Sequence, residues 1–123
     1  MKSLRLHDHG QATVELALTL PILFMVLLGG VQVAELGRNQ LAVQLAAREG
    51  ARAAAVADDP TAGARAAVDR AIALRPIDVL VSLDATTVTV TVTFVDHTEV
   101  SMVGALLPDV TLQASATMAF EPP

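Results

Sequence analysis

The feature that most constrains this chain is an uncharged run of 19 residues, Leu16–Ala34, which lies between Glu15 and Glu35. A helix rises about 1.5 Å per residue, so this run would cover about 28 Å, close to the ~30 Å hydrocarbon core of a bilayer. Its main polar residues are Thr19 and, near one end, Gln32. We therefore interpret the run as a membrane-spanning helix.

Two other interpretations of the run are weighed against this one. A secretory signal peptide also has a basic start, here Lys2 and Arg5, but its apolar centre usually covers about 7–15 residues. The small residues expected at a cleavage site are matched only loosely around Ala34. A helix buried in a soluble core is disfavoured because the rest of the chain is too small to enclose it. A cleaved signal peptide is thus the main alternative to a retained helix.

The composition of the 123-residue chain excludes several classes of function. A net charge of −5 provides no electrostatic footprint for DNA or RNA, so we expect no nucleic-acid partner. The chain has no cysteine, which excludes disulfides, thiolate zinc sites and cysteine nucleophiles. It also has no tryptophan or tyrosine to form a stacking platform. The length allows one small domain with an appendage.

We expect an α+β chain in four parts. Residues 1–10 form a short basic cytoplasmic leader, residues 11–34 the transmembrane helix, residues 35–57 a stalk helix, and residues 58–123 a small extracytoplasmic α/β module. A short basic N-terminus before a long C-terminal part favours an N-terminus in the cytoplasm. The chain is then a single-pass protein of the cytoplasmic membrane.

The stalk is predicted to be an amphipathic continuation of the membrane helix. Good helix formers fill residues 35–57, and no proline interrupts them. At 100° per residue the charged side chains share one broad arc, whereas small and apolar residues share the opposite one. The first set is Glu35, Arg38, Arg48, Glu49 and Arg52; the second is Leu36, Val43, Ala47, Gly50 and Ala54.

The remaining residues predict a short helix followed by a small antiparallel sheet. Asp59 can cap a helix over residues 60–74, with Pro60 in its first position. Strands are expected at residues 77–83, 87–94 and 110–120, with a hairpin turn at residues 84–86. A three-stranded sheet needs a cover, which we assign to this second helix. The apolar link over residues 97–109 is expected to fold onto the module or to touch the membrane surface.

We find no arrangement of residues typical of catalysis. His7 and His9 lie in the leader, and His97 is isolated beside Asp96. No glycine-rich phosphate loop is present, since Gly29 and Gly30 lie within the apolar run. We therefore predict no enzyme activity, no cofactor, no metal and no small-molecule substrate.

Glu15 is the residue that carries functional information. A carboxylate at the end of an apolar helix is unfavourable within a membrane unless it is paired, although at headgroup level it can simply mark the helix start. The segment Gly10-Gln11-Ala12-Thr13-Val14-Glu15-Leu16 is similar to the leader-peptide site of type IV pilin-like proteins. This resemblance implies cleavage between Gly10 and Gln11 by a prepilin peptidase. The new amine of Gln11 would then pair with Glu15 on a neighbouring subunit.

A longer ordered pattern resembles one particular family. Val14-Glu15-Leu16-Ala17-Leu18, the pair Leu20-Pro21, the end of the apolar run at Gly29–Gly37, and the helix Arg48-Glu49-Gly50-Ala51-Arg52-Ala53-Ala54-Ala55 follow one another as in TadE-like proteins. These are pseudopilins of the tight-adherence (Tad) pilus system. The resemblance covers residues 10–56 well and the C-terminal strand loosely.

The resemblance implies a structural role in assembly of a Tad-type pilus or a related secretion apparatus. The implied partners are membrane lipid, other pilins or pseudopilins, inner-membrane assembly proteins and prepilin peptidase. Pro21, Gly29 and Gly30 would provide a bend or a close-approach surface for another helix. The rival hypothesis is a generic signal-anchored or exported small domain without a pilus role.

Overall fold

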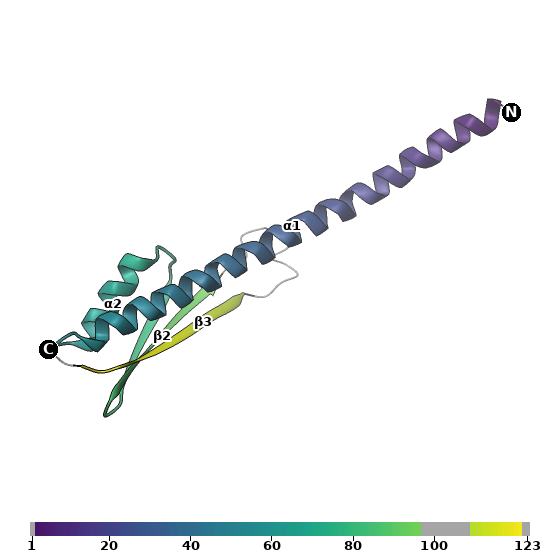
Figure 1. Cartoon of the computed structure of the whole chain (residues 1–123). Coiled ribbons are helices and arrows are strands. Elements are labelled where there is room, and N and C mark those ends of the chain that lie inside the picture. Colours follow the sequence, from purple (N-terminus) through teal and green to yellow (C-terminus); the bar gives the residue numbers. More distant parts are fainter. Residues whose placement is uncertain (1, 97–108, 122–123) are drawn as a thin grey trace. The chain divides into compact units, whose positions relative to one another are not determined.

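The computed structural model describes residues 2–96 and 109–121, with side chains from residue 10 onward. The chain contains two helices and three strands, in the order α1, α2, β1, β2, β3 (Figure 1). It divides into two compact units, Met1–Glu35 and Leu36–Pro123. This agrees with the predicted α+β class: a long apolar N-terminal helix, a second short helix and a three-stranded antiparallel sheet.

Helix α1, Lys2–Ala55, contains the apolar run and most of the predicted stalk. It begins before residue 11, so residues expected to form a leader are already helical. Pro21 lies inside α1, and the helix continues on both sides of it. α1 ends at Ala55, two residues earlier than predicted, because the chain turns there towards Asp59, which starts the next helix.

Helix α2, Pro60–Ala71, begins where the sequence predicts. The Asp59 carboxylate accepts hydrogen bonds from the backbone N–H groups of Thr61 at 3.1 Å and Ala62 at 3.2 Å, as an N-cap should. The predicted end at residue 74 is wrong. Ile72 is extended and buried in the core, so the chain leaves the helix before Pro76 requires it to.

The strands are β1, Ile77–Leu83, β2, Thr87–Asp96, and β3, Val110–Ala119, in the spatial order β1-β2-β3. Both pairings are antiparallel. The predicted hairpin is confirmed, since the backbone N–H of Asp84 donates to the carbonyl of Thr87 at 2.9 Å. The link expected to fold onto the module or to touch the membrane surface lies, over residues 97–108, outside the described residues.

The two faces of the sheet differ in chemistry. Val88, Val90, Val92 and Phe94 of β2 are buried on one face. The other face carries threonines and serines, two pairs of which share hydroxyl hydrogen bonds of 2.8 Å across β2 and β3. The alternation thus sorts the side chains as the sequence predicts.

The cover of the buried face differs from the prediction, because the stalk shares it with α2. Alanines and Val43 of α1 join Ala64 and Val68 of α2 and the β2 valines in one core. A Cβ placed on Gly50 would lie 3.0 Å from both Val68 Cγ2 and Val90 Cγ1. α1 therefore approaches both neighbours through a residue without a side chain.

We predict that Gly50→Val destabilises the unit formed by residues 36–123 by about 1–3 kcal/mol, because the added atoms overpack the contact with Val68 and Val90. Gly37→Val is the matched control, since a Cβ at Gly37 meets nothing within 4 Å. Thermal unfolding of the detergent-solubilised chain, followed by circular dichroism, measures both. Equal stability of the two variants would contradict the close approach.

Candidate functional site

The apolar run of α1 is exposed along most of its length, and Gln32 near its end is the one buried residue. Leu18 is 67% exposed and Val26 is 66% exposed, although both are large apolar side chains. Helix α1 is long and apolar enough to cross a membrane, and none of its most apolar window is buried within the structure. A core helix of a soluble protein would be covered by its own chain, so this surface indicates membrane anchoring.

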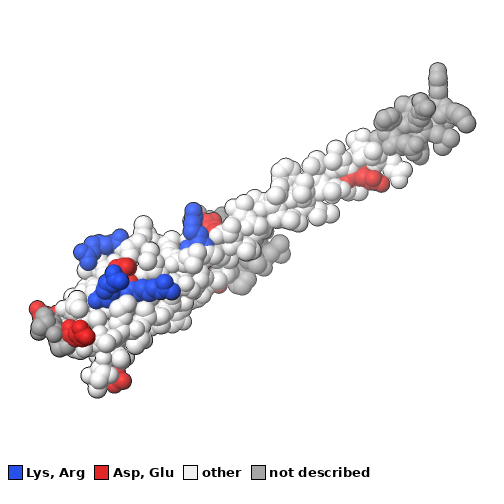
Figure 2. All heavy atoms as spheres, in the orientation of Figure 1, with Lys and Arg blue, Asp and Glu red and all other residues white. Residues whose placement is uncertain are grey.

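The charge distribution gives the same indication. Figure 2 shows a long stretch of α1 without basic or acidic side chains on the visible face. The sequence extends this observation to every face, since no charged residue lies between Glu15 and Glu35. The arginines Arg48 and Arg52 are exposed farther along α1, as the stalk prediction requires.

Glu15 lies at the N-terminal boundary of this uncharged surface. Its backbone carbonyl accepts a hydrogen bond of 2.6 Å from the Thr19 hydroxyl, within one turn of helix. Among the described residues, none donates to its carboxylate. The Glu15 side chain is exposed at the edge of an apolar surface and is available to a group from another molecule.

Gly10 and Gln11 are consecutive exposed residues of α1. A Cβ at Gly10 would meet nothing within 4 Å, so nothing in the described fold demands glycine there. The bond between them lies one turn before Glu15 in the sequence. The bond between Gly10 and Gln11 is helical and is not covered by any described part of the chain.

Gly29 and Gly30 also lack an internal reason to be glycine. A Cβ on either would meet nothing within 4 Å, in contrast to Gly50. Pro21 has no N–H, so it cannot donate the helical hydrogen bond to the carbonyl of Ala17. These three residues weaken an isolated helix without improving a contact inside the described chain.

The predicted site residues do not converge. Gly10 and Gly30 belong to one helix and are 20 positions apart, which corresponds to about 30 Å along its axis. In the described residues no group of three or more histidine, aspartate or glutamate side chains is placed to hold a metal ion. The arrangement is a linear surface suited to contact with lipid and other helices.

The sequence analysis missed two polar contacts between α1 and the sheet. The buried Asn39 side chain donates from Nδ2 to Asp96 Oδ2 at 3.0 Å. Gln40 donates to the backbone carbonyl of Gln113 at 3.2 Å. Asp96 and Gln113 are both distant from α1 in the sequence. The one available signal was the polar residue Asn39 in the mainly apolar stripe of the stalk.

Residues 10–52 match the family described as TadE-like protein, which confirms the resemblance inferred from the sequence. The matched segment includes Gly10, Glu15, Pro21 and the glycine pair, and it ends within the stripe that packs on β2. No curated protein and no solved structure matches the chain.

We predict that Phe24→Arg combined with Leu27→Arg prevents stable membrane integration. Each arginine near the centre of a span is unfavourable by about 2.5–3.5 kcal/mol on the insertion scale. The control is Leu41→Arg combined with Leu45→Arg, at two exposed leucines beyond the uncharged run. Resistance to alkaline carbonate extraction should be lost in the first variant and kept in the second. Equal extraction of both would show that the apolar run is not the anchor.

Proposed function

Because residues 10–52 are TadE-like, we propose that this chain is a membrane-anchored, pseudopilin-like structural component that assists assembly of a Tad-type pilus or a related secretion apparatus. One observation carries the proposal. The matched segment includes the exposed, uncharged helical surface and, at its boundary, the Glu15 carboxylate, to which no described residue donates a hydrogen bond.

The proposed topology follows from the distribution of apolar and charged residues. The helix of residues 11–34 crosses the cytoplasmic membrane once, with the N-terminus in the cytoplasm. The stalk and the sheet then lie outside, where the chain can meet pilins, other pseudopilins and assembly proteins. The role is structural, through contacts made by this surface, and no step of it requires a cofactor.

Processing would supply Glu15 with a partner that the described residues do not provide. Hydrolysis of the bond between Gly10 and Gln11 by prepilin peptidase would release the leader and leave a cationic amine on Gln11. An amine and a carboxylate at the membrane boundary stabilise each other, because each is unfavourable there without a counter-ion. Pairing of Glu15 with the Gln11 amine of a neighbouring subunit would fix the lateral register of two helices.

Gly29, Gly30 and Pro21 support lateral packing in the same segment. Small residues let two membrane helices approach closely, and the open space around both glycines leaves room for a neighbour. A neighbouring helix can also satisfy the backbone carbonyl that Pro21 leaves without its helical donor. We therefore assign the glycine pair and Pro21 to contacts with a helix of another molecule.

Cleavage after Gly10 is tested by the intact mass of membrane-extracted protein, with and without co-expressed prepilin peptidase. We expect a mature chain that begins at Gln11, and its loss when the peptidase is absent or when Gly10→Ala is introduced. Gly37→Ala should be processed normally, since it changes an open helical glycine outside the proposed site. An uncut chain with the peptidase present would favour the generic signal-anchored domain. A cut after Ala34 would show that the run is a signal peptide.

The pairing role of Glu15 predicts that Glu15→Gln lowers cross-linking between neighbouring subunits at least several-fold. Glutamine keeps the size of the side chain but removes the charge that the amine requires. Glu15→Asp, which keeps the charge, should retain most of the cross-linking, and all three forms should be processed alike. Unchanged cross-linking in Glu15→Gln would return Glu15 to the role of a helix-start residue.

A further inference from the structure

The outer edge of β1 is an unpaired strand edge. In β1 and β2, Asp84 and Thr87 form a hydrogen-bonded pair, and pairs of this kind alternate along an antiparallel ladder. The backbone groups of Ser82, Leu80 and Asp78 therefore face β2. Those of Val81, Val79 and Ile77 face away from the sheet, and no described residue hydrogen-bonds to them.

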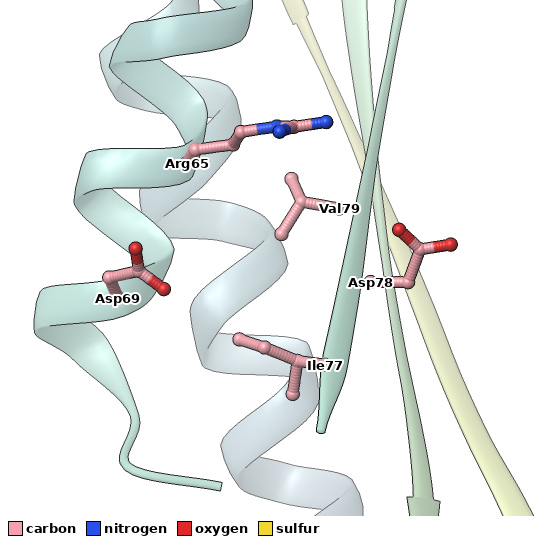
Figure 3. A pocket seen from close by; sticks show the side chains of 5 residues that line it. All are labelled: Arg65, Asp69, Ile77, Asp78 and Val79. Carbon is pink, nitrogen blue, oxygen red and sulfur yellow. The ribbon is translucent and has the colours of Figure 1, made fainter. Parts of the chain in front are cut away.

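Helix α2 borders this edge and forms a hollow with it. The hollow is about 210 Å³ and is lined by Arg65 and Asp69 of α2 and by Ile77, Asp78 and Val79 of β1. Figure 3 shows the Arg65 guanidinium pointing from α2 towards β1 above Val79, whereas the Asp78 carboxylate lies on the far side of the strand. The hollow thus combines the apolar side chains of Ile77 and Val79, outward backbone groups of β1, the Arg65 guanidinium and the acidic residues Asp69 and Asp78.

Arg65 is the basic side chain that lines the hollow, and it has no hydrogen-bond or ion-pair partner among the described residues. Asp69 is already engaged, since its Oδ1 lies 3.2 Å from Arg75 Nη2. No described residue accepts a hydrogen bond from Arg65, although Asp69 is only one helical turn away. An incoming carboxylate would therefore meet an uncommitted guanidinium.

The other edge of the sheet, at β3, is partly covered. Gln40 donates to the carbonyl of Gln113, which points away from β2. Just after β3, the backbone N–H of Glu121 donates to the carbonyl of Ala55 at 2.9 Å. The Gln40 side chain and the Ala55 carbonyl of α1 thus hydrogen-bond to backbone groups in β3 and just after it. Among the described residues, α2 makes no such hydrogen bond to the outer edge of β1.

We propose that the β1 edge receives an extended acidic peptide segment of a partner protein as a fourth strand. The segment would bond to the outward backbone groups of Ile77, Val79 and Val81, as in recognition by strand addition. Its apolar side chains would rest on the floor of the hollow, and an aspartate or glutamate would pair with Arg65. This inference does not depend on the pilus role.

The probe is a nine-residue peptide of alternating threonine and valine with aspartate at its centre, added to the full chain in detergent micelles. We expect it to shift the backbone amide resonances of Ile77, Val79 and Val81 and to leave those of Ser115 and Thr117 in place. Shifts confined to β3, or no binding at all, would overturn the proposal. Concentration-dependent shifts of the β1 amides without peptide would assign the edge to a second copy and would also overturn it.

The role of Arg65 is tested by charge. Arg65→Gln should weaken binding of the aspartate peptide about three- to tenfold and leave an asparagine counterpart unaffected. Arg70→Gln is the matched control, because Arg70 is exposed on the same helix but does not line the hollow. Arg65→Glu should restore affinity for a peptide with lysine at its centre. Equal affinities of the aspartate and asparagine peptides for the unaltered chain would overturn the assignment of an acidic partner.

Discussion

The close contact between α1 and the valine face of β2 is the interaction on which the unit of residues 36–123 depends. The apolar face of this three-stranded sheet would be exposed to water without a cover, which is unfavourable. The fold solves this with small residues on α1, because Ala46, Ala47 and Gly50 let the helix axis come near the sheet. Larger residues at these positions would separate the layers and expose Val90. The charged arc of the same helix segment is left at the surface.

The use of small residues against the sheet gives α1 two different kinds of surface along its length. Before residue 35, large apolar side chains are exposed and suit lipid. After residue 36, the large side chains come from the strands, and the helix contributes mainly alanines to the core. Surfaces of large residues face hydrocarbon, whereas small residues permit close packing against protein. The sequence changes from one to the other within a few turns.

Much of the fold could be predicted because local patterns determine it. The strict alternation of valine and threonine in β2 and the Asp59-Pro60 start of α2 depend on neighbouring residues only. The end of α2 could not be predicted, since burial of Ile72 depends on strands that follow later in the chain. For the same reason the bond between Asn39 and Asp96, 57 positions apart, had no local signal. Glu15 was found from its place at the end of the uncharged run, the proposed processing residues Gly10 and Gln11 were found from a resemblance, and the hollow beside β1 was found only from the structure.

The hydrogen bond between Glu121 and Ala55 has a consequence for how the protein is made. Ala55 ends α1, whereas Glu121 follows the last strand. β2, the centre of the sheet, also needs β3 to cover its second edge. The unit of residues 36–123 therefore cannot close until β3 has been synthesised. Until then the alanine stripe of α1 is uncovered, and a chaperone that binds apolar surface would meet it before the sheet has formed.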